Sequence, residues 1–266
     1  MTGNFIGGKN KLKLPMLQSG TLFIGKSVLK LDRTESTNDV MLQKLKSRQE
    51  AEGWVVIANH QTRGKGAGTN SWHDEPGKNL LMSLLLKPTF IKAADQFLLN
   101  ELICVSIADA LKTCCGIEVK LKWPNDIYIS NKKCGGVLIE NALVGDIIKQ
   151  SVVGIGLNLN QKDFSDMKNA TSVLNETGNE FIIEEVMNEI CFLIEKNYLK
   201  LKSGNVSTTK SAYLKQLFGL NEKRKFRKGV EVFEGCIRGI NKTGMLQIET
   251  ENGLLDFGFK EVEFLF

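Results

Sequence analysis

The segment between residues 119 and 140 constrains the fold more than any other part of the sequence. A short alternating strand is interrupted by Pro124, and the apolar residues that follow run into a turn at Asn131 and then into a further strand. Because proline fixes a turn directly after the strand, it directs Asn125 and Asp126 toward one place. The segment therefore predicts an antiparallel hairpin that carries polar groups at both ends.

The returning strand of this hairpin brings a lysine toward the same site. Lys133 stands beside Gly135 and Gly136, and glycines allow another backbone or a ligand to approach closely. A lysine in such a place suits a reaction in which two anions must meet. From these residues alone, a hairpin with a solvated lysine tip remains the alternative.

Two further segments present polar groups beside regular elements. The cluster Ser36-Thr37-Asn38 precedes a short apolar-periodic stretch, so it predicts a helix N-terminus. Between Gln61 and Trp72 a loop places three glycines at alternate positions with two cations among them, which suits the binding of a phosphate or carboxylate. The loop does not match the dinucleotide-binding motif G-x-G-x-x-G, because Thr69 stands where that motif needs its last glycine. A flexible surface loop stays open as the alternative.

The remaining chain alternates between strand and helix patterns and then changes character. After Asn221, short apolar stretches alternate with tight turns, which predicts a small β-barrel. Residues 1–20 show no apolar periodicity and are interpreted as a tail. The other expected elements are strands at 54–58, 79–87 and 151–160 and helices at 93–115, 183–201 and 207–218.

Composition and single motifs exclude several classes of protein. Hydrophobic residues make up 42% and charged residues 24% of the chain, which predicts a folded core with little disorder. Apolar stretches such as 80–86 are far shorter than the ~20 residues of a membrane helix, and residues 1–20 lack a secretory signal. We therefore expect a cytoplasmic protein with no membrane contact.

Cysteine and histidine usage narrows the chemistry further. The six cysteines form no C-x-x-C pair and are expected to be reduced, and the two histidines fit no zinc motif. No G-x-S-x-G elbow of a serine hydrolase is present. Residues 3–10 nearly match the spacing of a P-loop, but Asn10 replaces the magnesium-binding Ser/Thr and no strand precedes them, so the match is interpreted as chance.

Four motifs in order resemble those of the biotin–protein ligases, also called holocarboxylase synthetases, from about Thr21 onward. They correspond to the family's S-T-N, its Gln-Thr with G-[RK]-G and Trp, its K-W-P-N-D with lysine and glycine, and its G-x-G-x-N. In this sequence they are Ser36-Thr37-Asn38; Gln61-Thr62 with Gly64-Lys65-Gly66 and Trp72; Lys122-Trp123-Pro124-Asn125-Asp126 with Lys133 and Gly136; and Gly154-Ile155-Gly156-Leu157-Asn158.

The resemblance implies an α+β fold, with a mixed sheet flanked by helices in residues 21–220 and a small β-barrel in residues 221–266. It also implies a two-step reaction. Biotin and ATP give biotinyl-5′-AMP and pyrophosphate, and the biotinyl group then passes to a lysine of a biotin carboxyl-carrier domain of acetyl-CoA carboxylase or a related carboxylase. Mg²⁺ is expected to accompany ATP.

The resemblance also implies roles for individual residues. Lys133 and Lys65 are the expected catalytic residues, and Asp126 is an expected magnesium ligand. Biotin is expected to contact Ser36, Thr37, Asn38, Gln61, Gly64, Lys65, Gly135 and Gly136. ATP is expected to contact Trp72, Lys122, Asn125, Asp126, Lys133 and Asn158.

Two departures and two rival functions complete the prediction. The family's loop usually carries further basic residues where this chain has Ala67 and Gly68, and only about 20 residues precede Thr21 where repressor members have a DNA-binding domain. Nucleic-acid binding is therefore not expected, and a homodimer is left open.

The rival enzyme class is the lipoate and octanoyl transferases, which lack the run at 122–126. A nucleic-acid-binding module would need an aromatic series between clustered cations, which the C-terminal segment lacks.

Overall fold

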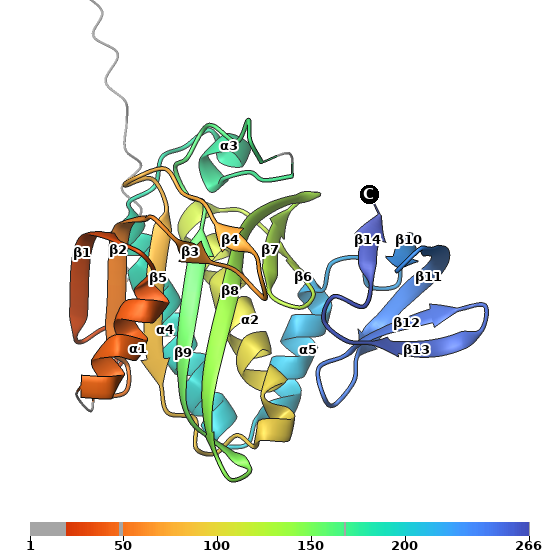
Figure 1. Ribbon diagram of the computed structural model, residues 1–266, viewed down its shortest axis with the longest axis horizontal. Helices are drawn as coiled ribbons and strands as arrows, with labels where there is room; N and C mark the ends of the chain where they lie inside the picture. The colour runs from red at the N-terminus through yellow and green to blue at the C-terminus, as the bar shows by residue number, and fades with distance from the viewer. Residues whose placement is uncertain (1–19, 48–49, 168, 266) are drawn as a thin grey trace, which may run out of the picture.

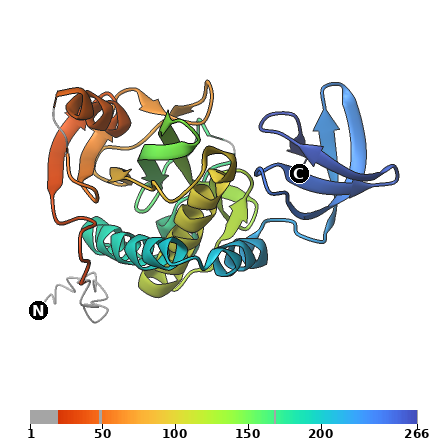
Figure 2. The ribbon, with the colours of Figure 1, turned by 90° about the horizontal axis from the view of Figure 1, so that it is seen from below.

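The computed structural model describes residues 20–47, 50–167 and 169–265. The predicted tail, apart from Gly20, and the segment resembling a P-loop lie outside these ranges. Figures 1 and 2 show a main sheet with helices on both faces and a smaller C-terminal sheet beside it. None of the helices in the described ranges is long and apolar enough to cross a membrane.

The main sheet has seven strands in the order β1-β2-β5-β9-β8-β7-β6. β1 pairs with β2 in parallel, whereas the other neighbours are antiparallel, so the sheet is mixed. Its strands are β1 (Val28–Thr34), β2 (Val55–Gln61), β5 (Leu80–Leu86), β9 (Ile147–Leu157), β8 (Lys132–Val144), β7 (Asp126–Ile129) and β6 (Lys120–Lys122).

Helices cover both faces of this sheet, which explains why every residue of β5 is buried. On one face α1 (Thr37–Ser47) packs its Met41 against Val56, Leu85 and Val152 of the sheet. On the other lie α2 (Phe97–Cys115), α4 (Ile183–Lys202) and α5 (Val206–Gln216), with η1 (Ala93–Asp95) leading into α2. The predicted α+β class, a mixed sheet flanked by helices, is confirmed.

The C-terminal sheet has the order β13-β12-β11-β10-β14, with all pairs antiparallel. Its strands are β10 (Lys223–Lys228), β11 (Glu231–Ile240), β12 (Leu246–Thr250), β13 (Gly253–Phe257) and β14 (Glu263–Leu265). The sequence predicts a barrel here. In the described part of the chain, β13 and β14 are edge strands that do not pair with each other, so the strands form an open five-stranded sheet.

The two sheets meet beside the predicted hairpin. The indole Nε1 of Trp123, which follows β6, donates to the carbonyl of Gly244 at 2.8 Å, and the ring of Phe218 packs against that of Phe264. Buried residues of both sheets belong to one apolar cluster. The domain boundary near residue 220 remains a prediction, although the change from helix to short strands occurs there.

Several elements differ in extent from the sequence prediction. The predicted loop between Gln61 and Trp72 contains the short strands β3 (Gly64–Lys65) and β4 (Ser71–Trp72), and α3 (Val173–Thr177) has no predicted counterpart. β9 begins four residues earlier than expected because its tight hairpin with β8 turns at Gly145, where φ is +60°. Only a residue tolerant of positive φ fits this turn, and glycine is the usual one.

Candidate active site

A cleft of about 400 Å³ opens beside the predicted hairpin. Its walls come from the start of α1, the loop around β3 and β4, the β6–β8 hairpin, β9 and the loop between β13 and β14. Eleven of the sequence-predicted site residues line it: Ser36, Thr37, Asn38, Gln61, Lys65, Trp72, Lys122, Asn125, Asp126, Lys133 and Gly136. The structure thus brings four separated motifs to one cavity.

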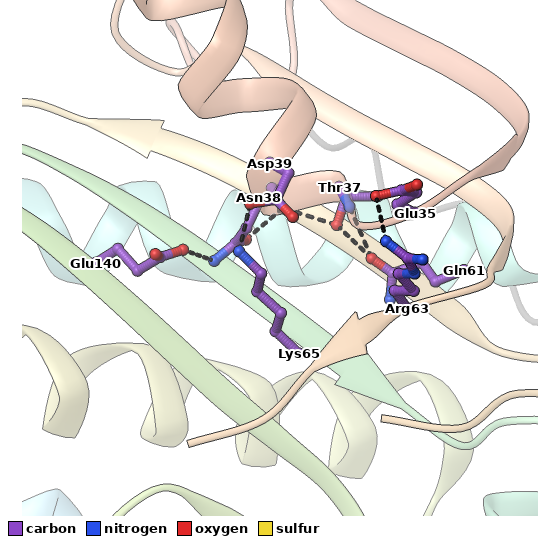
Figure 3. Close-up of polar contacts among 9 residues, drawn as sticks. Glu35, Thr37, Asn38, Asp39, Gln61, Arg63, Lys65 and Glu140 are labelled. Carbon is purple, nitrogen blue, oxygen red and sulfur yellow. Dashed lines mark hydrogen bonds and ion pairs between the residues drawn. The ribbon is translucent and has the colours of Figure 1, made fainter. Parts of the chain in front are cut away.

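The start of α1 forms one end of the cleft through a network of side chains (Figure 3). The backbone N–H and the hydroxyl of Thr37 both donate to Oε1 of Gln61, at 2.7 and 3.1 Å. This fixes the orientation of the Gln61 carboxamide, whose NH₂ group makes no hydrogen bond within the described residues. The hydroxyl of Ser36 is likewise unpaired there. Both groups are available to a polar ligand.

Asn38 has a different position in this network. Its Nδ2 donates to Oε2 of Glu140 at 2.7 Å, and its Oδ1 lies 2.6 Å from the hydroxyl of Ser83. Both ends of the carboxamide are therefore occupied. Neither Glu140 nor Ser83 appears among the predicted site residues. Ser83 has a signal in the sequence, because it is the single polar residue in the apolar strand Leu80–Leu86.

The two cations of the glycine-rich loop are held by carboxylates at the start of α1 (Figure 3). Lys65 forms an ion pair with Asp39, and Arg63 lies 3.6 Å from Glu35. The hydrogen bond to Asp39 raises the pKa of Lys65, although burial opposes this. Lys65 lines the cleft, so its charge is both fixed and accessible to a ligand.

The β7–β8 hairpin supplies a further cation to the cleft. Nζ of Lys133 lies 2.6 Å from Oδ1 of Asp126, as the closing of the β7–β8 hairpin predicts. Asn125 in the preceding turn is fixed on the same side, because its carbonyl accepts from the N–H of Val137 at 2.9 Å and its Nδ2 donates to the Val137 carbonyl. The turn thus holds Asn125 and Asp126 rigidly at the cleft, and the Trp123–Pro124 peptide bond within it is cis.

Lys122 is partly enclosed by aromatic rings. Its Nζ lies 3.2 Å from the Tyr128 hydroxyl and 4.9 Å from the ring centroids of both Tyr128 and Phe264. Burial lowers the pKa of Lys122, and nearby Asp126 partly opposes this shift. The lysine is therefore desolvated and sits where β6 meets the C-terminal sheet.

The two glycines of β9 admit side chains of this protein. A Cβ on Gly154 would lie 2.5 Å from Oδ1 of Asn38, and a Cβ on Gly156 would lie 2.8 Å from the indole of Trp72. Side chains from distant segments therefore occupy the space beside both glycines. The indole Nε1 of Trp72 is buried and has no partner in the described residues, so it can donate to a ligand.

Three predicted site residues do not line the cleft. Gly64 and Gly135 pack against neighbouring backbone, since a Cβ would lie 2.6 Å from the Trp72 carbonyl and 2.9 Å from the Gly156 carbonyl. Asn158 is buried, and its Nδ2 donates to the carbonyl of Thr171 at 3.0 Å, which fastens the segment before α3 to the sheet.

The C-terminal sheet contributes lining residues that sequence analysis missed. Phe259, Lys260, Val262, Glu263 and Phe264 reach the cleft from the loop and strand after β13. No local pattern marks them, because they meet the glycine-rich loop only in the folded chain: Lys260 contacts Thr69, 191 residues earlier.

Comparisons with known proteins agree with this geometry. Residues 31–158 match the biotin/lipoate A/B protein ligase family. The chain is 31% identical to the biotin–[acetyl-CoA-carboxylase] ligase of Paracoccus denitrificans over 81% of this chain and 91% of the relative. It is 29% identical to the bifunctional ligase/repressor BirA of Bacillus spizizenii over 91% of this chain and 75% of that relative.

A solved structure shows the same fold. The biotin protein ligase of Aquifex aeolicus in complex with biotin and ATP superimposes with a TM-score of 0.76 at 28% identity, covering 90% of this chain and 99% of that one. The chain therefore belongs to the biotin/lipoate A/B protein ligase family, and within it to the biotin–protein ligases.

Proposed function

We propose that this cleft catalyses both steps of ATP-dependent protein biotinylation. The observation that carries the proposal is the placement of Lys65 and Lys133 in one cavity, each held by a carboxylate, beside polar groups that lack partners. Two fixed cations lower the repulsion between a carboxylate and a triphosphate, which must meet for adenylation. The matching relatives and the biotin and ATP complex support this assignment.

In the first step a carboxylate oxygen of biotin attacks the α-phosphorus of ATP. A new P–O bond forms, and the bond to the β-phosphate oxygen breaks, so pyrophosphate leaves with the electron pair and biotinyl-5′-AMP remains. In the second step the neutral amine of an acceptor lysine attacks the acyl carbon. AMP leaves, the amine loses a proton, and an amide bond joins biotin to the acceptor.

The start of α1 is the proposed biotin end of the cleft. The ureido ring of biotin has one carbonyl acceptor and two N–H donors, which need buried polar partners. The NH₂ group of Gln61 can donate to that carbonyl, and the unpaired hydroxyl of Ser36 can accept from one of the N–H groups. Thr37 orients Gln61, and Asn38 is held by Glu140, so both act mainly by positioning. Of the three glycines expected near biotin, Gly136 lines the cleft, whereas Gly64 and Gly135 shape its wall by packing against neighbouring backbone.

The hairpin is the proposed ATP side. Lys133 offsets the charge that builds on the α-phosphate, and Asp126 holds its ammonium group in place. The buried indole N–H of Trp72, the Asn125 turn and Lys122 line the same cleft, and we assign them to the nucleotide. Asn158 does not line the cleft. We propose that it affects the nucleotide indirectly, by holding the segment before α3 in place.

Magnesium fits this site only as a partner of ATP. The described residues contain no group of three or more His, Cys, Asp or Glu side chains that could hold a metal ion. Mg²⁺ keeps several waters and is usually held by one or two carboxylates together with substrate phosphates. Asp126 is the one carboxylate that we propose for this role, and the ion would neutralise phosphate charge as ATP binds.

The acceptor is a carboxylase carrier protein, and we propose that it is the biotin carboxyl-carrier domain of acetyl-CoA carboxylase or a related enzyme. The name of the Paracoccus relative supports this choice. We place the reaction in the cytoplasm. The proposal concerns ligase activity alone. The Bacillus relative is named both a ligase and a repressor, and this chain matches 75% of its length.

The decisive experiment supplies ATP, Mg²⁺ and either biotin or lipoate, and identifies the acyl-adenylate by mass. Biotinyl-5′-AMP is expected with biotin, because Ser36 and Gln61 offer polar partners that the ring of lipoate cannot use. Formation of lipoyl-AMP instead would favour the rival transferase class, and the absence of both products would contradict the proposed function.

Gly156→Ala is expected to weaken ATP binding by about tenfold while leaving biotin binding nearly unchanged. The added methyl group would lie 2.8 Å from the Trp72 indole, and overpacking of this kind costs about 1–3 kcal/mol. Calorimetric titration with each ligand measures the effect. In the double variant with Trp72→Phe the smaller ring makes room, so the two changes should not add. Additive losses would show that the glycine acts elsewhere.

A further inference from the structure

The loop between β3 and β4 has unpaired backbone donors. Two hydrogen bonds close it, from the N–H of Gly66 to the Asn70 carbonyl at 2.8 Å and from the N–H of Asn70 to the Ala67 carbonyl at 3.4 Å. The N–H groups of Ala67, Gly68 and Thr69 donate no hydrogen bond over the ranges that the structure describes. Consecutive unpaired amides in a turn are a common way to bind an anion.

The loop's own cations do not complete such a site. Arg63 is paired with Glu35 and does not line the cleft, and Lys65 is paired with Asp39. Ala67, which does line the cleft, offers only a methyl group. Any further positive charge near these amides must therefore come from another part of the chain.

Lys260 is in the right place to supply it. It lies in the loop between β13 and β14, lines the cleft, and its Nζ is 3.5 Å from Oγ1 of Thr69. A Cβ built on Gly68 would lie 2.6 Å from this Nζ, so the ammonium group rests directly on the loop. In contrast to Lys65 and Lys133, Lys260 forms no ion pair with any described carboxylate.

The backbone of Lys260 is also unusual. Its φ is +65°, in the left-handed region that favours glycine and is costly for a lysine. Such a conformation persists where the surrounding structure holds it, and it is often found at ligand sites. A glycine would fit this turn with less strain.

We infer that Lys260 is a phosphate-binding residue of this enzyme, supplied by the C-terminal sheet to the glycine-rich loop. Its ligand class is the phosphate chain of ATP and the single phosphate of the acyl-adenylate. The inference rests on the proposed function for the identity of the nucleotide. It gives the C-terminal sheet a direct part in holding the reactive intermediate.

The test compares three variants with the wild type by calorimetric titration with ATP and, separately, with biotin. Lys260→Gln removes the charge and keeps most of the stem, and Lys260→Gly also relieves the backbone. Lys242→Gln is the matched control, because Lys242 is an exposed lysine of the same sheet that does not line the cleft. ATP binding is expected to weaken by about tenfold in both Lys260 variants and to stay unchanged in the control.

Two further readouts separate binding from a structural role. Biotin affinity should be unchanged, and the melting temperature of Lys260→Gly should equal or exceed that of the wild type. Wild-type ATP affinity in Lys260→Gln would overturn the inference, as would a parallel loss of biotin binding and melting temperature in both variants. A wild type that binds ATP but forms no biotinyl-AMP would contradict the proposed function, while the ATP comparison still decides the role of Lys260.

Discussion

Replacing Lys133 with alanine is expected to slow biotinyl-AMP formation by about a hundredfold or more, the usual effect of removing one preorganised group that stabilises transition-state charge. The structure adds a second reason. Because Nζ of Lys133 lies 2.6 Å from Oδ1 of Asp126, its loss leaves a carboxylate without this partner at the place where anions must enter. Both effects act on the nucleotide, so biotin affinity should change little.

Isotopic exchange between pyrophosphate and ATP measures this step without an acceptor protein. Lys132→Ala is the matched control, since it removes the adjacent exposed lysine of the same turn and should retain wild-type exchange. Near-normal exchange in a folded Lys133→Ala variant would remove this lysine from the chemistry.

The hairpin that supports this prediction could be predicted because its information is local. Pro124 ends one strand, and the turn at Asn131 fixes how the next strand returns, so Asp126 and Lys133 must lie at one end. The same holds for α2, whose apolar spacing and final Gly116 with φ +66° mark its end. Short-range patterns therefore gave both the elements and the charged pair.

The packing between distant segments could not be predicted in the same way. The glycines at 154 and 156 indicate close approach, but nothing near them in the sequence identifies Asn38 and Trp72 as the groups that approach. Lys260 has no motif at all, and only the placement of the C-terminal sheet brings it to the loop. Likewise, turns and apolar stretches predicted the strands after Asn221 but not that the edges of the sheet stay unpaired.

Replacing Glu101 is expected to have the second large effect, which is on the stability of the fold. It lies in α2, where that helix packs against α4 and α5, and its side chain is 4% exposed with no described partner for Oε2. Burial raises the pKa of Glu101 from 4.5 to about 7, and Lys210 of α5 partly opposes this shift. Burial raises the pKa values of Cys104 on the same helix and of Tyr213 on α5, and nearby Glu101 adds to both shifts.

The direction of the pH dependence follows from these pKa values. Below about pH 4.5 the carboxyl group is protonated in the folded and the unfolded chain, so it costs no stability. Between about pH 4.5 and 7 the unfolded chain loses this proton while the folded chain retains it, so the free energy of unfolding falls as pH rises. Above about pH 7 the full cost of a buried carboxylate is present.

Glu101→Gln is therefore expected to stabilise the protein at pH 8 by up to about 3 kcal/mol, since each pKa unit corresponds to ~1.4 kcal/mol. Near pH 4.5 the variant and the wild type should unfold alike, because glutamine resembles the protonated acid. Denaturant unfolding at both pH values measures the difference. Glu251→Gln, at an exposed turn, should change neither. Equal stability of wild type and Glu101→Gln at pH 8 would show that the carboxylate is solvated or paired in solution, and the buried face of α2 would then have no pH-dependent cost.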